Sequence, residues 1–288
     1  MRLNIPFVLL VNFLSLISTA VGLTSPPYDA ITVGTNGNYT CLNGALEDTS
    51  SDVYFIYAGT YTEQVVINRP NIKIYGQTSC NNSAYTSNQV TITNNVSASV
   101  AGNNDKSGTV RIRPAATGVR QVLQPLAGYQ DTLYANRGDQ FYGKNYIEGA
   151  VDFIFGQQAS IWITGSTLNT IGSGFITASG RSVNDSTYYI IDNSNITGIG
   201  NQRLGRPWRS FARVIVQNSV IGPHVNTEGW SQWSNLSANT DNIFFGEYNN
   251  SGPGAWRTGC TPLAKKLRAS IPISISLGNT SWIDPAYL

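Results

Sequence analysis

A series of short β-prone runs, each closed by Gly, Asn or Ser, constrains the fold more than any other feature of this chain. The runs are rich in Val, Ile, Thr and aromatic residues, which favour strands, and the turn residues between them end each strand. Helical periodicity is weak, and the best helical candidate beyond the N-terminus is the stretch 263–267. Strands are expected at 65–67, 72–75, 90–93, 110–113, 153–155, 161–163, 175–177, 188–191, 214–216 and 243–245.

Runs as short as these favour a right-handed parallel β-helix over a sandwich or a barrel. In this solenoid each coil of about 20–25 residues stacks on the preceding coil and buries a continuous apolar column. The similar phrases at 161–168 and 189–196 fit two successive coils. We therefore predict an all-β fold, a single-stranded right-handed parallel β-helix.

The first 22 residues are predicted to be a secretory signal peptide, which leaves 23–288 for the β-helix domain. Arg2 supplies a positive start, the run 5–17 is largely apolar, and small residues follow as acceptable cleavage sites. The apolar run is too short for a transmembrane span, and no later stretch qualifies. A secreted, extracellular protein is expected.

Composition supports secretion independently. The chain has eight N-x-Ser/Thr sequons and only 12% charged residues. Its net charge of 18 − 16 = +2, or +1 after removal of Arg2, favours neither nucleic acid nor a membrane surface as a partner. In an oxidising compartment Cys41 and Cys80 could pair, leaving Cys260 over. The sequons open at Asn38, Asn81, Asn95, Asn184, Asn195, Asn235, Asn249 and Asn279.

Two aspartates, Asp131 and Asp152, lie 21 residues apart in β-prone settings. Isolated aspartates are more often polar residues on the solvent face of a strand. In a solenoid, however, this offset is about one coil, so the two would lie on neighbouring coils roughly 5 Å apart. The spacing therefore predicts a carboxylate pair, in which desolvation disfavours the charged form.

Other chemistries have little support. His224, the one histidine, lies in a turn and is expected at the surface, and the chain has no Gly-x-Ser-x-Gly elbow. Neither a His-ligated metal site nor the CxxC spacing of a zinc site is indicated, so no metal or cofactor is expected. Glu63 is predicted to be structural and to hydrogen-bond a turn. Any catalysis must then use carboxylates, arginine and amides.

Six phrases of the chain resemble those of the pectin methylesterases, and most closely the fungal ones. The resemblance covers about 28–285 in the family's order. It implies a right-handed parallel β-helix and a secreted enzyme, expected to be a monomer, that hydrolyses the C6 methyl esters of homogalacturonan (pectin) to pectate and methanol. The phrases are GTYTEQV at 59–65, GYQDTLY at 128–134, GAVDFIFG at 149–156, ITASGR at 176–181, LGRPW at 204–208 and GWSQW at 229–233.

The resemblance also assigns roles to residues. Asp152 corresponds to the nucleophile and Asp131 to the general acid/base. Arg206 corresponds to the arginine that orients the nucleophile, and Gln130 to one of two glutamines that stabilise the tetrahedral anion. From the residues alone, the tryptophans fit a core as well as a sugar-binding surface. The substrate-binding residues that the resemblance implies are Trp208, Phe155, Trp230 and Val151.

The chain departs from the family just before Gly128. The family has its second anion-stabilising glutamine about one coil before the Gln-Asp-Thr-Leu motif. Here the chain runs from Arg113 to Gly128 without room for another strand pair, and Gln121, the nearest remnant, lies only nine residues before Gln130. The β-helix is therefore predicted to be shortened by about two coils, or about forty residues.

Three functional hypotheses follow. The first is an active pectin methylesterase. The second is a non-catalytic or impaired pectin-binding relative, because losing one anion donor typically costs about 10²–10³ in rate. The third, a pectate lyase or polygalacturonase, is disfavoured because the sequence shows no acidic calcium cluster, no Gly-His-Gly and no Arg-Ile-Lys phrase.

Overall fold

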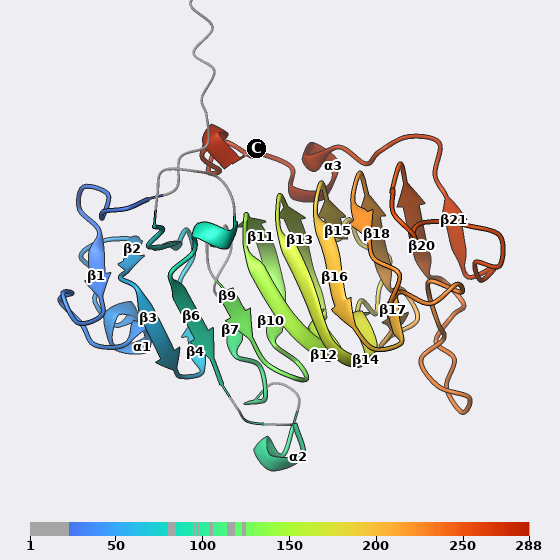
Figure 1. Ribbon diagram of the computed structural model, residues 1–288, viewed down its shortest axis with the longest axis horizontal. Coiled ribbons are helices and arrows are strands. Elements are labelled where there is room, and N and C mark those ends of the chain that lie inside the picture. Colours follow the sequence, from blue (N-terminus) through green and yellow to red (C-terminus); the bar gives the residue numbers. More distant parts are fainter. Residues whose placement is uncertain are drawn as a thin grey trace, which may run out of the picture.

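Parallel pairing between strands of successive coils organises the chain into a solenoid (Figure 1). Among the residues that the structure describes, the strands form a ten-stranded sheet and an eleven-stranded sheet that run along its length. The predicted all-β parallel β-helix is thereby confirmed. The computed structural model describes residues 23–79, 85–94, 96, 98–103, 106–113, 119–122 and 125–287.

The coils between residues 53 and 221 contribute strands to both sheets. The first sheet contains β1 (Ile31–Val33), β2 (Val53–Ile56), β5 (Lys73–Gly76), β8 (Val119–Val122), β11 (Arg137–Gly143), β13 (Gln158–Thr164), β15 (Tyr189–Asp192), β18 (Arg213–Gln217), β20 (Phe244–Tyr248) and β21 (Ala264–Lys266). The second contains β3 (Gly59–Thr62), β4 (Val65–Ile67), β6 (Val90–Thr93), β7 (Val110–Ile112), β9 (Pro125–Ala127), β10 (Leu133–Ala135), β12 (Tyr146–Gly156), β14 (Thr167–Ser179), β16 (Asn195–Ile199), β17 (Gln202–Pro207) and β19 (Val220–Ile221).

All ten runs expected to be strands coincide with or overlap observed strands. The helix expected at 263–267 is wrong, because β21 forms there instead. Its backbone pairs with β20, and the hydrogen bonds of that pairing outweigh a weak helical preference. The short helices described are α1 (Leu42–Leu46), α2 (Ala98–Ala101), α3 (Ile273–Leu277), η1 (Tyr85–Ser87) and η3 (Pro285–Tyr287).

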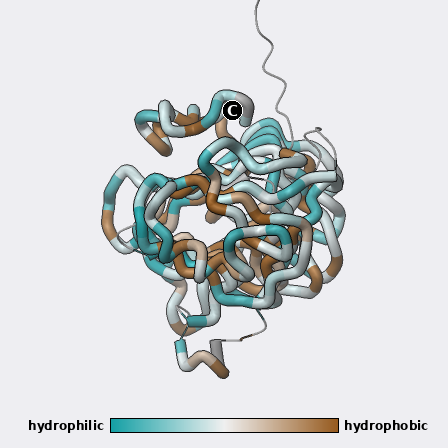
Figure 2. The backbone as a smooth tube through the Cα atoms, turned by 90° about the vertical axis from the view of Figure 1, so that its left-hand side faces the viewer, coloured by the Kyte–Doolittle hydropathy of each residue, from teal (hydrophilic) through white to brown (hydrophobic). Residues whose placement is uncertain are grey.

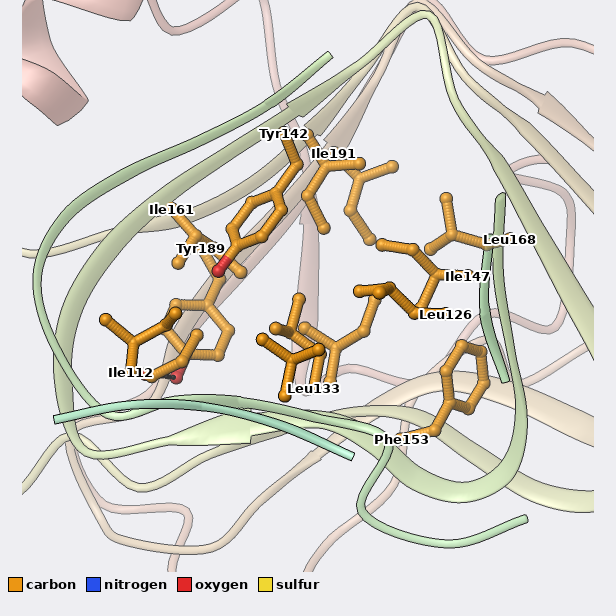
Figure 3. Packing of buried hydrophobic residues seen from close by; sticks show 14 of the residues in the cluster. Ile112, Leu126, Leu133, Tyr142, Ile147, Phe153, Ile161, Leu168, Tyr189 and Ile191 are labelled. Carbon is orange, nitrogen blue, oxygen red and sulfur yellow. Dashed lines mark hydrogen bonds between the residues drawn. The ribbon is translucent and has the colours of Figure 1, made fainter. Parts of the chain in front are cut away.

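Apolar side chains from both sheets fill the interior of the coils. Figure 3 shows Leu126, Ile147 and Leu168 pointing inward opposite Tyr142 and Ile161, and all five are fully buried. Viewed along the solenoid, the apolar residues gather toward the inside of the coils (Figure 2). Each fully buried aliphatic side chain contributes about 1.5–3 kcal/mol, so the column holds the coils in register.

A ladder of short polar side chains fixes the turn between the two sheets. The backbone N–H of Asn145 donates to Ser166 Oγ, that of Ser166 to Ser194 Oγ, and that of Ser194 to Ser219 Oγ, at 2.9, 3.2 and 3.1 Å. The Ser219 N–H donates to Asn250 Oδ1 at 3.0 Å. The residues before these five adopt left-handed backbone: Lys144, Gly165, Asn193, Asn218 and Asn249. Repeating one turn in these five successive coils keeps their strands aligned.

The C-terminal segment 271–287, here the C-terminal strap, returns over the outer face of the first sheet (Figure 1). Its buried residues Leu277, Ile283 and Tyr287 belong to one apolar cluster with outward-facing side chains of that sheet. The Lys144 ammonium lies 5.1 Å from the Tyr287 ring centroid. The sheet residues buried in this cluster are Phe55, Tyr75, Phe141, Trp162, Ile190 and Ile215.

The stretch between Arg113 and Gly128 contains β8 and β9, so the expectation that it leaves no room for a strand pair is wrong. Strand β8 pairs with β5 and β11, and β9 pairs with β6 and β12. Strand β7 pairs directly with β4 and β10. Removing whole coils from a solenoid leaves a continuous stack of this kind, because each coil contacts only its neighbours. The predicted shortening stays a prediction.

The structural role predicted for Glu63 is confirmed. Its two carboxylate oxygens accept the backbone N–H groups of Leu42 and Asn43 at 2.8 and 3.0 Å. These amides open α1 and have no partner within the helix. Glu63 thus joins the first turn of α1 to the following coil.

Some predictions fall outside the described residues. They are the signal peptide 1–22, the pairing of Cys41 with Cys80, and the sequons at Asn81 and Asn95. The asparagines of the other six sequons are all exposed. In the part of the chain that the structure describes, no helix is long and apolar enough to cross a membrane.

Candidate active site

The structure brings Asp131 and Asp152 together on neighbouring coils, as their spacing predicts. A bridge between Gln130 and Val151 places the two aspartates at the same step of their coils, and the Asp131 N–H donates to the Val151 carbonyl at 3.2 Å. Both aspartates have left-handed backbone, with φ of 58° and 49°. This conformation is uncommon in non-glycine residues, although Asp and Asn adopt it more readily than others, and here it sets the direction of both carboxyl groups.

Arg206, from β17, holds the carboxylate of Asp152 with two hydrogen bonds. Its Nε donates to Oδ1 at 3.0 Å and its Nη2 to Oδ2 at 2.6 Å. Asp152 is 5% exposed, so this pair is shielded from water. A planar fork against a carboxylate fixes orientation as well as charge. The contact between the two side chains is the one that the resemblance implies, and their roles in a reaction stay a prediction.

Two aromatic rings enclose the Arg206 guanidinium. Its Cζ lies 4.1 Å from the Phe175 ring centroid and 4.2 Å from that of Trp233. Its Nη1 also donates to the Trp233 carbonyl at 3.4 Å. These contacts restrict the guanidinium to one plane, and with it the carboxylate of Asp152.

Asp131 has a different environment. Its side chain is 1% exposed, and Oδ2 accepts the Ser107 hydroxyl at 2.8 Å. Its Oδ1 is buried and accepts no hydrogen bond from the described residues. Burial raises the pKa of Asp131 to about 7; the Ser107 hydrogen bond and the Arg206 charge oppose this rise, and the Asp152 charge adds to it.

The two carboxyl groups are therefore unlike. Burial also raises the pKa of Asp152, and the hydrogen bonds and charge of Arg206 oppose the rise. Asp152 has a guanidinium to stabilise its ionised form, whereas Asp131 has one hydroxyl. A proton shared by the pair thus resides on Asp131. One ionised and one protonated carboxyl near neutral pH is the arrangement that acid/base catalysis requires.

Replacing Asp131 with asparagine is expected to stabilise the fold at pH 8. The folded pKa of about 7 lies above the unfolded value of 3.8, so the stabilising effect of this proton is complete below pH 4 and is lost as pH rises through 7. Asparagine cannot ionise and tolerates left-handed backbone equally well. Urea unfolding should show a gain of up to ~4 kcal/mol at pH 8, shrinking toward pH 4. An unchanged difference across this range would contradict the prediction.

An aromatic cluster lies beside the carboxylates. The rings of Tyr134 and Phe155 stack with centroids 4.6 Å apart, and Trp208 lies 6.3 Å from Phe155. Trp208 and Trp233 are partly buried in this cluster, which leaves part of each ring open to a ligand. Phe155 is only 1% exposed, so the expectation that it contacts substrate is wrong; its ring packs against those of Tyr134 and Trp208. Val151 is half-buried beside Asp152.

Trp230 belongs to the core, so the prediction that it lines the sugar cleft is wrong. It is 1% exposed and stacks on Phe245 at 4.5 Å. Its Nε1 donates to Glu247 at 3.1 Å. The phrase GWSQW predicts the right segment, but the tryptophan at the site is its second one, Trp233.

Gln130 lies half-buried next to Asp131, whereas Gln121 lies in β8 of the first sheet, in register with Tyr142. Gln121 thus belongs to a different part of its coil. The pairing of Leu133 with Val110 shows which residue precedes Gln130 by one coil. Gln130 lies three residues before Leu133, and Ser107 lies three residues before Val110. Ser107 therefore occupies the position one coil before Gln130.

Histidine and metal chemistry gain no support. His224 is half-buried, and burial lowers its pKa. Within the described ranges, no group of three or more His, Cys, Asp or Glu side chains is arranged to hold a metal ion. The site consists of two carboxylates, one arginine, one amide and aromatic rings.

Comparison of the sequence with known proteins identifies one family. The family model described as Pectinesterase matches residues 78–261. The chain is 37% identical to the "Probable pectinesterase A" of Neosartorya fischeri over 300 aligned positions, covering 91% of this chain and 90% of that protein. It is 36% identical to the "Pectinesterase" of Aspergillus aculeatus, covering 93% and 95%.

Solved structures have the same fold. The pectin methylesterase of Aspergillus niger superposes with a TM-score of 0.79 at 35% identity, and the match covers 92% of this chain and 100% of that one. The pectin methylesterase from carrot superposes with a TM-score of 0.69 at 24% identity, covering 85% and 91%. The second similarity extends only to the fold.

Proposed function

Because the chain belongs to the pectinesterase family, we propose that it is a secreted enzyme that hydrolyses the C6 methyl esters of homogalacturonan to pectate and methanol. One observation carries this proposal: Asp152 is held bidentately by Arg206 and lies beside a buried Asp131 whose pKa is raised to about 7. A fixed carboxylate is a suitable nucleophile, and a protonated carboxyl beside it is a suitable acid.

In the first half-reaction the Asp152 carboxylate attacks the ester carbonyl at C6. The carbonyl oxygen becomes an anion, which the side-chain amide of Gln130 stabilises. When this intermediate collapses, the bond to the methoxy oxygen breaks and Asp131 donates its proton to that oxygen. Methanol leaves, and C6 remains bonded to Asp152 as an acyl-enzyme.

The second half-reaction restores both carboxyl groups. Asp131, now ionised, accepts a proton from water as the water oxygen attacks C6. The bond between C6 and Asp152 breaks, which releases the galacturonic acid, and the second proton of the water passes from this acid to solvent to leave the galacturonate carboxylate. Asp131 is again protonated and Asp152 is again ionised beside Arg206, ready for the next ester.

The partly exposed aromatic rings are suited to bind the sugar chain. Trp208 and Trp233 present ring surface beside the carboxylates, and aromatic faces pack well on pyranose rings. Val151 is placed to contact the sugar next to the ester. No partner besides the polysaccharide is required for this reaction, which agrees with an expected monomer.

Two observations support the finer parts of the proposal. Six described sequon asparagines are exposed, as an extracellular glycoprotein requires. The alignment with the Neosartorya fischeri relative spans 300 positions, and 91% of 288 residues is about 262, so about 38 positions have no counterpart in this chain. That number supports a shortening of nearly two coils.

The test is methanol release from highly methylated pectin by the secreted, folded chain, with a no-enzyme blank at each pH. Methanol formed together with an equal number of new carboxylates would support the esterase. A folded chain that binds pectin without releasing methanol would support the impaired relative instead. Unsaturated or shortened oligogalacturonides would indicate a lyase or a polygalacturonase.

The rate should also depend on pH in a defined way. The first half-reaction needs Asp131 protonated, so kcat/KM should fall about tenfold per pH unit above a pH of about 7. Initial rates at low pectin concentration between pH 4 and pH 9 measure this limb. A rate that still rises at pH 9, after subtraction of the blank, would exclude Asp131 as the acid.

A further inference from the structure

Ser107 reaches Asp131 from the preceding coil. It lies one coil before Gln130 and is 2% exposed. Its hydroxyl donates to Asp131 Oδ2 at 2.8 Å across 24 residues of sequence. It belongs to none of the six phrases that identify the family.

The chain beside Ser107 packs closely against the coil of Asp131. A Cβ added to Gly108 would lie 3.1 Å from the Tyr134 Cβ and 3.4 Å from the Asp131 carbonyl oxygen. The contact with the Tyr134 Cβ is tighter than a side chain normally makes, so a residue with a Cβ at 108 would require a shift of a few tenths of an ångström between the two coils. Glycine at 108 thus allows the backbone to approach until the Ser107 hydroxyl meets the carboxyl group.

We infer that Ser107 is a positioning residue for the reaction proposed above: its hydroxyl holds Oδ2 of Asp131, so that Oδ1 carries the transferred proton. A carboxyl group free to rotate would offer either oxygen to the substrate. With Oδ2 occupied, the oxygen left for transfer is Oδ1, which is buried and accepts no hydrogen bond from the described residues. The methoxy oxygen of a bound ester would supply the missing partner for its proton.

The same hydrogen bond acts after the proton has been transferred. An ionised Asp131 is more strongly stabilised by a hydroxyl donor than a protonated one. The charged groups that act on Asp131 are Asp152 on β12, which favours protonation, and Arg206 on β17, which favours ionisation. Removing the Ser107 hydroxyl alters neither of them, so its effect can be measured separately.

The experiment uses the full chain with Ser107→Ala. Loss of the donor should move the alkaline limb of kcat/KM upward by about one pH unit and lower kcat about tenfold. Carbon NMR of aspartate carboxyls, assigned with Asp131→Asn, should show the same upward move in the titration of Asp131. The matched control is Ser166→Ala, which removes a hydroxyl, 2% exposed, that donates to the Thr164 carbonyl; it should leave both curves in place.

A folded Ser107→Ala chain with unchanged pH limb and unchanged Asp131 titration would overturn the inference. If that variant does not fold, Ser107→Cys takes its place, because it nearly keeps the volume and weakens the donor. It should shift the alkaline limb of kcat/KM and the Asp131 titration upward by less than Ser107→Ala would. An absence of any shift would again overturn the inference. A wild-type chain that releases no methanol would defeat the proposed function alone. The NMR titration would still test whether Ser107 controls Asp131.

Discussion

Replacing Asp152 with asparagine is expected to abolish methanol release, by about 10⁴-fold or more, in a chain that stays folded. The amide is nearly isosteric with the carboxylate and tolerates the same left-handed backbone, so the β12 strand should be undisturbed. It is, however, a far poorer nucleophile. It also leaves the Arg206 guanidinium without the anion that it contacts through two hydrogen bonds.

The measurement is methanol release per folded molecule, with folding checked by circular dichroism and pectin binding measured separately. Asp192→Asn is the matched control, because Asp192 ends β15 in the first sheet and accepts the side-chain amides of Gln217 and Asn218. It should retain its turnover. Near-native activity in the Asp152 variant would remove that residue from its proposed role.

Replacing Arg206 with lysine should lower kcat about 10²-fold or more, although the positive charge is kept. Lysine is a point charge on a flexible stem, and it can neither form the fork against both oxygens of Asp152 nor fill the space between Phe175 and Trp233. The carboxylate would then rotate away from its line of attack. The loss should appear in kcat more than in KM if the arginine acts as proposed, by orienting the carboxylate of Asp152.

Arg203→Lys provides the control for this variant. Arg203 lies on the same strand, three residues earlier, and pairs with the exposed Glu228. Exposed pairs contribute little, so its kcat should stay near that of the wild type. Equal losses in the two variants would indicate a general effect on β17, and a near-native Arg206→Lys enzyme would make the arginine merely structural.

The carboxylate pair was predictable because a solenoid converts sequence offset into proximity. Once the short β-runs suggested coils of about 20–25 residues, an offset of 21 placed Asp152 above Asp131. The same rule could have found Ser107, which precedes Asp131 by 24 residues. The strand expected at 110–113 marks its coil, but Ser107 lies three residues before that strand, and no motif distinguishes it from the many other serines of the chain.

Which tryptophan lies in the core and which lies at the site could not be predicted from the sequence. Trp230 and Trp233 lie in one phrase, and residue type alone does not separate them. Trp230 forms a bridge with Gly205, which directs its ring into the core, whereas Trp233 follows a turn and reaches Arg206. Side-chain direction inside an irregular loop depends on the backbone path, and the period of two that orders a strand is lost there.

The C-terminal strap has a consequence for how this molecule unfolds. In a simple stack of coils, the terminal coils fray first, because each is held only by its neighbour. Here the strap extends from the last coil back over β18, β15, β13 and β11, so the final coil cannot detach without stripping apolar cover from coils far behind it. The C-terminal half, with Arg206 inside it, should therefore melt as one cooperative unit, and the rigidity of the arginine that holds Asp152 depends on residues at least 65 positions further along the chain.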